Sequence, residues 1–301
     1  MTTTTPLNEG KIIKKISFVS IAGNAVLSVF KLIAGILGHS SAMISDAIHS
    51  FSDVFTTLIA LVGVKISGRT ADDSHPYGHE RLECVASLIL GLVLMITGLG
   101  IGKTGLESII YGTYKDLSSP GAIALAAAAF SIACKEGMYW YTRNNAKKIN
   151  SSAFMADAWH HRSDALSSIG ALIGIGGTML GFPVMDPAAS VLICLFILKV
   201  SYDILKDALS KMLDTSCGED YDKKLMEYIS TREDIARIDM LRSRMFGSKV
   251  YVDLEIALDG DSSLKEAHDV AERIHRDVEK QFPDVKHIMI HMNPLVDSSV
   301  K

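Results

Sequence analysis

Long apolar stretches dominate the first two thirds of the chain, and short polar breaks separate them. Stretches of about 20 or more residues are long enough to cross the roughly 30 Å hydrocarbon core of a bilayer as helices. We place six of them, near residues 13–37, 42–68, 82–108, 118–142, 152–180 and 186–210. Turn-forming residues such as Gly38 and Gly181 lie in the breaks. The pattern predicts a membrane domain built as an all-α six-helix bundle.

Residues after Asp214 show a shorter periodicity that is typical of a small soluble α+β domain. Helical patterns over residues 223–231 and 264–282 combine with strand patterns over residues 235–246, 249–258 and 285–291. In the middle strand, one face carries Val250, Val252, Leu254, Ile256 and Leu258. Ser263 and Glu266 form a capping box in front of the second helix. This αββαβ order predicts a split, ferredoxin-like sandwich.

Composition and charge agree with a division into three parts. The mean hydropathy is +0.25, and 48% of residues are hydrophobic while 21% are charged, which is more apolar than a typical soluble protein. Acidic residues outnumber basic ones by 18 to 13 over residues 218–301. We therefore expect an N-terminal tail over residues 1–11, a six-span transmembrane domain over 12–214 and an acidic soluble domain over 215–301.

Basic residues gather at alternate breaks, and this orients the predicted helices. Three lysines, at positions 11, 14 and 15, lie around the start of the first stretch, and further basic residues border the second and fourth breaks. Because Lys and Arg near helix ends stay on the cytoplasmic side, both termini are expected to be cytoplasmic. The first stretch lacks a small-residue cleavage site after it, which indicates a membrane helix and not a removable signal peptide. The four cysteines are widely spaced and predict neither a disulfide framework nor a thiolate zinc site.

An octapeptide in the second stretch recurs in the fifth. Residues 46–53 read DAIHSFSD and residues 157–164 read DAWHHRSD, so that five of eight positions match. The copies lie three spans apart, which is an odd number, and they therefore run through the membrane in opposite directions. This is the signature of an inverted repeat, whose binding site is expected at the repeat interface.

The histidine and last aspartate of each copy form a plausible metal site. Residues at positions i and i+4 share one helical face, so His49 with Asp53 and His160 with Asp164 can each present an imidazole and a carboxylate. Two facing helices then complete a four-ligand N₂O₂ tetrahedron, which suits Zn²⁺. Any one of these residues alone could equally be a hydrogen-bond partner between helices. Four ionisable groups at membrane depth, with matched spacing, favour a transport site.

Other ionisable residues in the stretches leave alternatives open. Asp46 and Asp157 each precede the histidine by three residues, and they can either supply access to the ligands or have a purely structural role. Lysines and a glutamate also occur in or near the spans, and long lysine side chains can reach the interface by snorkelling. We assign these residues no function: Lys31, Lys135, Glu136 and Lys199.

Three segments together resemble the cation diffusion facilitator family over essentially the whole chain: SDAIHSFSD, ADDSHPYGHERLE and DAWHHRSD. The resemblance implies that the four intramembrane residues bind one transported ion. The combination of His/Asp with His/Asp is similar to the zinc branch of the family, which often also takes cobalt or cadmium, whereas manganese members tend to lack these histidines. It also implies a homodimer, joined partly through cytoplasmic domains that bind metal.

The resemblance implies further sites outside the spans. Asp72, His75 and His79 match a second family site in the loop after the second span, although the motif can also be structural. In the cytoplasmic domain the matching positions are Asp239, Asp253, His268 and His291, and two of these are Asp where zinc-loaded members have His. Asn293 also replaces an expected acid, so a two-metal cluster there stays open.

Two remaining patterns have a routine alternative. His287 and His291 share one face of the last strand, where they can bind metal or simply be solvated. Arg81 and Asp214 resemble a charge interlock between the membrane bundle and the soluble domain, but an ordinary interfacial ion pair would look the same.

These observations predict a transporter and not an enzyme. We expect efflux of Zn²⁺, with Cd²⁺, Co²⁺ or Fe²⁺ as further substrates, in exchange for protons, because imidazole and carboxylate ligands must lose protons to bind metal. Zn²⁺ is expected as substrate and as a structural or regulatory ion. The expected partners are a second copy of the chain and the lipid bilayer, with no nucleic acid. The short break between the fourth and fifth spans resembles prokaryotic members, which places the protein in the plasma membrane.

Alternative functions fit the sequence less well. A membrane di-iron oxidase needs about eight histidines in boxes such as HxxHH, a metalloprotease needs HExxH, and an ATP-driven pump needs a Walker A or phosphorylation motif. The chain contains none of these motifs. An Fe²⁺ or Mn²⁺ exporter of the same family and a transport-inactive metal sensor remain as alternatives.

Overall fold

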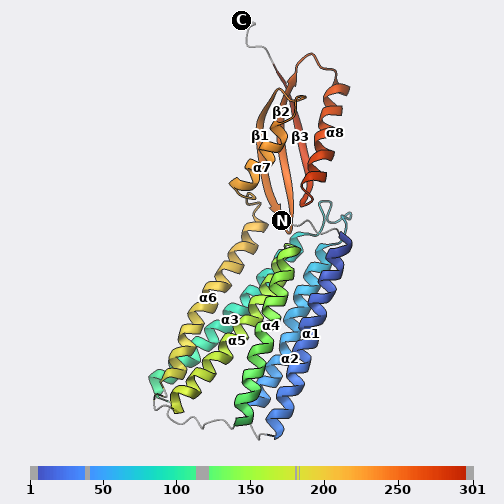
Figure 1. The fold of residues 1–301 in the computed structure, drawn as a ribbon. Coiled ribbons are helices and arrows are strands. Elements are labelled where there is room, and N and C mark those ends of the chain that lie inside the picture. The colour runs from blue at the N-terminus through green and yellow to red at the C-terminus, as the bar shows by residue number, and fades with distance from the viewer. Residues whose placement is uncertain (1–5, 38–40, 113–121, 180–181, 183, 296–301) are drawn as a thin grey trace. The chain divides into compact units, whose positions relative to one another are not determined.

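The computed structural model describes residues 6–37, 41–112, 122–179, 182 and 184–295, and its chain divides into two compact units, residues 1–209 and 210–301 (Figure 1). The first unit consists of long helices that run alongside one another. In the described residues these are α1 (Pro6–Leu37), α2 (Ser41–Ser67), α3 (Arg81–Tyr111), α4 (Ala122–Lys148), α5 (Ser152–Met179) and α6 (Met185–Met212).

The helices follow the predicted apolar stretches except at two ends. α1 already begins at Pro6, so residues 6–11, which the sequence pattern assigned to a tail, form its first turns. α4 continues to Lys148, so the predicted end of this stretch at residue 142 was too early, and the turn is confined to residues 149–151. Residues 143–148 contain no Gly or Pro, so their polarity alone does not end the helix. The chain turns at Asn150, whose φ of 49° is left-handed.

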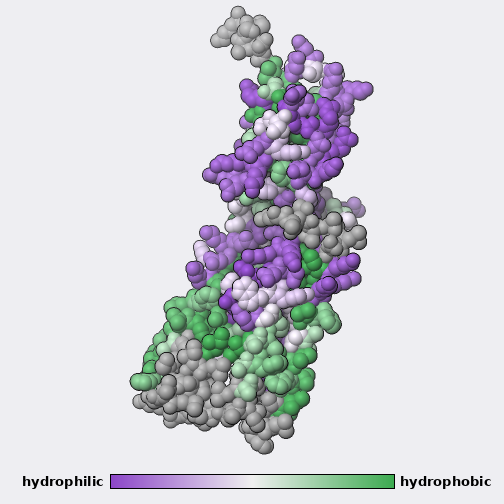
Figure 2. All heavy atoms as spheres, in the orientation of Figure 1, coloured by the Kyte–Doolittle hydropathy of each residue, from purple (hydrophilic) through white to green (hydrophobic). Residues whose placement is uncertain are grey.

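The helical unit exposes many apolar side chains and buries several ionisable ones. Phe18, Ile96 and Leu192 are 73%, 69% and 68% exposed, whereas Asp53 and His160 are buried. Figure 2 shows hydrophobic residues over much of this unit's visible face and hydrophilic residues over the C-terminal unit. Among the described residues, Glu9–Ile33 and α3 have the length and apolarity of membrane spans. A bundle that exposes its apolar residues and buries its ionisable ones is the reverse of a soluble protein.

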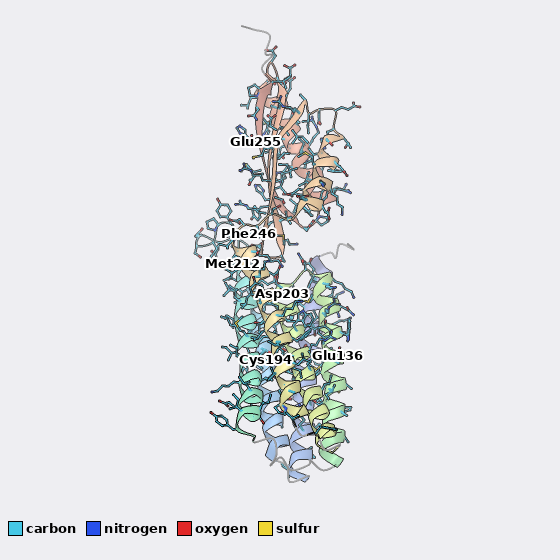
Figure 3. The ribbon with its side chains drawn as sticks, turned by 90° about the vertical axis from the view of Figure 1, so that its left-hand side faces the viewer. Glu136, Cys194, Asp203, Met212, Phe246 and Glu255 are labelled. Carbon is cyan, nitrogen blue, oxygen red and sulfur yellow. The ribbon has the colours of Figure 1, made fainter. Side chains whose placement is uncertain are left out.

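Polarity changes along α6. Figure 3 shows Cys194, Asp203 and Met212 in this order along the helix. Leu192 and Leu195 are exposed on its first part, whereas the exposed residues after Asp203 are mostly charged. Such a boundary is typical of a helix that leaves the hydrocarbon and enters the interface.

Glycines on α3 allow α6 to approach closely. A Cβ atom added at Gly102 would lie 2.4 Å from the Sγ atom of Cys194, and one at Gly98 would lie 2.8 Å from Ile197. Small residues mediate close helix packing in membranes, because backbones gain van der Waals contact where no hydrophobic driving force exists. The glycines therefore fix the distance between these two helices.

The C-terminal unit contains α7 (Glu219–Ser230), β1 (Arg237–Phe246), β2 (Lys249–Asp259), α8 (Leu264–Gln281) and β3 (Val285–Leu295). This confirms the αββαβ order. The sheet has the order β1-β2-β3, with β1 antiparallel and β3 parallel to β2. The small mixed sheet agrees with the expected fold class, and the ferredoxin-like assignment stays a prediction.

One face of the sheet packs against both helices of this unit. The core contains the five alternating apolar residues of β2, as predicted, together with Leu225 and Ile229 of α7 and Ile274 and Val278 of α8. The capping box is also confirmed, since the Ser263 hydroxyl accepts from the Glu266 backbone N–H at 3.2 Å while the Glu266 carboxylate accepts from the Ser263 backbone N–H at 2.8 Å.

Candidate metal-transport site

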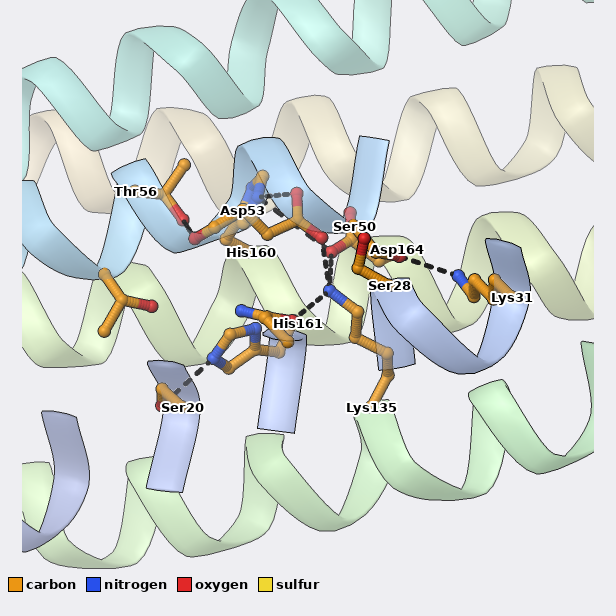
Figure 4. Close-up of polar contacts among 12 residues, drawn as sticks. Ser20, Ser28, Lys31, Ser50, Asp53, Thr56, Lys135, His160, His161 and Asp164 are labelled. Carbon is orange, nitrogen blue, oxygen red and sulfur yellow. Dashed lines mark hydrogen bonds and ion pairs between the residues drawn. The ribbon is translucent and has the colours of Figure 1, made fainter. Parts of the chain in front are cut away.

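The two copies of the octapeptide meet between α2 and α5, in the interior of the helical unit. The Oδ1 atom of Asp53 lies 3.2 Å from Nε2 of His160, which lies 3.9 Å from Oδ2 of Asp164 (Figure 4). Their side chains are 2%, 6% and 9% exposed. The three residues can each offer a ligand atom within 4.8 Å of the others, a spacing from which small side-chain rotations reach a common ion.

The structure thus brings together three of the four predicted ligands. His49 lies on α2, one helical turn before Asp53, but its side chain is outside the described part of the structure. The same holds for the side chain of Asp46. The role of His49 as a ligand therefore stays a prediction, and both the access role and the structural role of Asp46 stay open.

Lys135 of α4 lies at the centre of this cluster, and the sequence analysis assigned it no role. Its Nζ atom donates to Asp53 at 2.5 Å, to Asp164 at 2.9 Å and to Asn24 of α1 at 2.9 Å. The side chain is 3% exposed. One ammonium group therefore joins the carboxylates of both halves of the repeat (Figure 4).

The sequence analysis missed Lys135 because a long lysine side chain can reach the membrane interface by snorkelling. In the structure the side chain is 3% exposed and donates to Asp53 and Asp164. A lysine buried in an apolar bundle needs anionic partners, and here they come from helices that are distant along the chain.

A polar cavity of about 60 Å³ lies beside the cluster. It is lined by Asp53, Lys135 and Asp164 together with serine and threonine side chains of neighbouring helices. Lys31 of α1 also lines it and donates to the hydroxyl of Ser50 at 2.8 Å. A polar space of this size can hold water molecules. The cluster therefore has room for solvent or for a partly hydrated ion.

Asp157 does not join the group of Asp53, His160 and Asp164. Its carboxylate accepts from the Thr57 hydroxyl of α2 at 3.0 Å, and its second oxygen lies 3.6 Å from Nε2 of His161. The same His161 atom lies 3.3 Å from the Ser20 hydroxyl of α1. These fully buried groups link α1, α2 and α5, which supports the structural role for Asp157 over the access role.

The loop between α2 and α3 brings its three predicted ligands together. His79 Nε2 lies 3.3 Å and His75 Nδ1 lies 3.5 Å from different oxygens of the Asp72 carboxylate. Hydrogen bonds from the Ser74 hydroxyl and the His75 backbone lower the pKa of Asp72 to about 2, so the carboxylate is anionic at neutral pH. The Nδ1 atom of His79 is buried and has no hydrogen-bond partner among the described residues. The loop can hold a cation.

The predicted cytoplasmic positions do not form a common cluster in the described residues. The candidate three-ligand groups there include none of Asp239, Asp253, His268 and His291. Instead, Asp239 accepts from Arg237 at 2.6 Å and from Asn293 at 2.8 Å, and these hydrogen bonds lower its pKa. Both of its oxygens are therefore occupied by donors.

The other predicted pair lies at helix ends. Arg81 begins α3 and Asp214, with a φ of 55°, follows α6. The two residues belong to different units of the chain. Their interlock stays a prediction.

Comparison with known proteins agrees with this architecture. Residues 17–213 match the cation efflux transmembrane domain, and residues 218–295 match the cytoplasmic domain of cation efflux proteins. The chain is 35% identical over 285 residues to an uncharacterised transporter of Methanocaldococcus jannaschii, covering 93% of this chain and 98% of that protein. It is 35% identical over 283 residues to the manganese efflux system protein MneS of Bacillus subtilis, with 93% and 94% covered. Identity to MneP of the same organism is 31% over 291 residues, with 94% and 97% covered.

Both domain matches span their respective units, and the relatives align over nearly their full lengths. The buried carboxylate and imidazole cluster lies within the transmembrane match. The chain therefore belongs to the cation diffusion facilitator family and is a membrane transporter for the efflux of metal cations.

Proposed function

We propose that this protein exports a divalent transition metal, with zinc as its preferred ion, from the cytoplasm in exchange for protons. The observation that carries the proposal is the convergence of Asp53, His160 and Asp164 inside an apolar-surfaced bundle. An imidazole nitrogen combined with carboxylate oxygens in a site of few ligands suits Zn²⁺ better than Mg²⁺ or Ca²⁺, which prefer more oxygen ligands.

Charge balance supports an exchange mechanism. The two carboxylates carry two negative charges, which a divalent cation neutralises when His160 is a neutral ligand. Without the metal, the Lys135 ammonium group and a proton on His160 can neutralise the same two charges. A metal ion and the ammonium group cannot both occupy the space between Asp53 and Asp164, so metal entry displaces Lys135. The lysine is then a tethered competitor of the transported ion.

The topology that this function requires is six membrane spans, α1 to α6, with both termini in the cytoplasm of a plasma-membrane protein. Exposed apolar residues on the helices support the spans, and the basic residues at alternate breaks support the orientation. We also propose a homodimer with a ferredoxin-like cytoplasmic domain, supported by the match of residues 218–295. The loop triad of Asp72, His75 and His79 is proposed as a second metal site.

Manganese efflux is the second candidate. MneP and MneS, which are similar over almost the whole chain, are named manganese efflux proteins. Mn²⁺ prefers sites made of oxygen ligands, whereas His160 supplies nitrogen to the cluster. Replacing His160 with aspartate should therefore shift selectivity from Zn²⁺ toward Mn²⁺ if the wild-type protein is a zinc exporter.

A flux assay tests the proposal directly. The purified protein is placed in liposomes with a metal-sensitive dye inside, a pH gradient is imposed, and Zn²⁺, Fe²⁺, Mn²⁺, Co²⁺ and Cd²⁺ are compared. Zn²⁺ should give the largest flux, the flux should depend on the gradient, and Asp164→Ala should abolish it. Asp203→Ala changes an exposed carboxylate of α6 and should retain wild-type flux. Equal flux in the wild type and Asp164→Ala would exclude the assigned site.

A further inference from the structure

His275, Glu279 and His287 form a compact group in the C-terminal unit. The sequence analysis considered His287 for metal binding together with His291, but it selected neither His275 nor Glu279. Nε2 of His275 lies 2.9 Å from Oε1 of Glu279, and the two imidazole ring centroids lie 5.3 Å apart at an interplanar angle of 70°. Each residue can offer one ligand atom within 4.8 Å of the other two. We propose that these three side chains bind a zinc-class divalent ion in a site separate from the transport site.

The helix presents two of the ligands on one side. His275 and Glu279 are separated by four residues of α8, which places them one turn apart on the same face. Their neighbours Ile274 and Val278 are buried in the core beneath the helix, so the adjoining stripe with the two ligands lies at the margin of the helix–sheet contact. The side chains of His275 and Glu279 are 31% and 34% exposed, which leaves them accessible to an ion from solvent.

An irregularity in the sheet brings in the third ligand. Val285 pairs with Val250, but the next pair along the strands is His287 with Tyr251, so Lys286 is an extra residue on β3. Such a bulge redirects the side chain that follows it. Val285 and Ile288 on either side of this point are buried in the same core as Ile274. Both ligand-bearing elements are therefore held by one packed core.

The donor set defines the class of ion. Two imidazole nitrogens and one carboxylate oxygen around an open fourth position are a common zinc arrangement, with water as the remaining ligand. Tetrahedral zinc with bonds of about 2.0–2.2 Å separates its ligand atoms by about 3.4 Å. Small side-chain rotations bring the present separations to that value. With one exchangeable position and partial exposure, the site would load and release its ion reversibly and would tie α8 to the start of β3.

The test counts zinc ions on the full-length protein in detergent. All variants carry Asp164→Ala, which removes the proposed transport site. Because each variant is compared with the same Asp164→Ala protein, the difference in bound zinc does not depend on whether the transport-site assignment is correct. Equilibrium dialysis with Zn²⁺ should show that His275→Ala and His287→Ala each bind one ion fewer per chain than the background protein. Co²⁺ titration should show a four-coordinate absorption band that both substitutions remove.

A matched pair of conservative variants guards against misfolding. Glu279→Gln should raise the Kd of the Co²⁺ site about tenfold or more, whereas Glu272→Gln, an exposed carboxylate on the same helix, should leave it unchanged. Unchanged stoichiometry and absorption in His275→Ala and His287→Ala would overturn the proposal. So would a four-coordinate band that disappears with His291→Ala but persists in His287→Ala, because the ion would then lie farther along β3.

Discussion

Replacing Lys135 with methionine removes the ammonium group that joins Asp53 to Asp164 and keeps most of the buried side-chain volume. In the wild type the lysine is 3% exposed and lies 2.5 Å and 2.9 Å from the two carboxylates. The variant leaves two buried carboxylates without this partner. We therefore expect the metal-free protein to be strongly destabilised and the metal-bound protein to be affected much less.

The size of both effects follows from the lysine contacts that exist in the metal-free protein and are lost in the metal-bound protein. Removing one partner of a buried ion pair destabilises a protein by about 3–5 kcal/mol, because an uncompensated charge remains. The wild type must break the same lysine contacts when a metal enters, so the variant avoids that loss on binding. A difference of about 3 kcal/mol corresponds to a roughly 100-fold lower Kd for the metal, at 1.4 kcal/mol per factor of ten.

Thermal unfolding in detergent measures the stability of the protein with and without metal, and metal titration measures its Kd for the metal. Lys135→Met should have a lower Tm than the wild type without metal, and saturating Zn²⁺ should recover most of the difference. Lys103→Met, which removes an exposed lysine of α3, should change neither quantity. If Lys135→Met binds Zn²⁺ with an unchanged or higher Kd, Lys135 does not compete with the metal and the exchange mechanism is wrong.

Three further predictions concern the fold. Gly102→Val should lower the Tm and the yield of folded protein, because a Cβ atom there would lie 2.4 Å from a sulfur atom of α6. Gly100→Val on the same helix meets open space and should be tolerated. Equal losses in the two variants would refute the packing argument. Ser263→Ala should destabilise the full-length protein by about 1 kcal/mol in chemical denaturation through loss of the helix cap, and no change would show that the cap is not limiting. Hydrogen bonds from two arginines hold the pKa of Asp234 below its usual 3.8, so its ion pairs contribute stability above that pH and lose it as the pH falls through the lowered pKa. Asp234→Asn should therefore cost roughly 1 kcal/mol at pH 7 and progressively less below about pH 4, and a pH-independent difference would exclude the ion-pair explanation.

Much of the proposed transport site was readable from the sequence. The repeated octapeptide identified Asp53, His160 and Asp164 as one group, because a helix places positions i and i+4 on one face and an odd number of spans reverses the second copy. The contribution of Lys135 was not readable, since nothing in the spacing of α4 pairs it with α2 and α5. Its hydrogen bonds to Asp53 and Asp164 depend on how α4 packs against these two helices.

In the C-terminal unit, too, some features were readable from the sequence and others depend on the tertiary structure. Alternation along β2 predicted the core face, and the capping box predicted where α8 begins, because both depend on local geometry. The grouping of His275, Glu279 and His287 depends on strand register and on the extra residue at Lys286. A one-residue irregularity of this kind leaves no periodic signal in the sequence.

The sequence by itself determined the order of the elements, the apolar character of the helical unit and the repeated His/Asp pairs that we propose as ligands. These properties follow from the periods of helix and strand and from the high free energy of burying ionisable groups in a membrane. Only the tertiary structure decided which cation faces the two carboxylates and which acid stays outside the cluster. Those choices depend on contacts between residues that are far apart along the chain, such as Lys135 with Asp53 and Asp157 with Thr57.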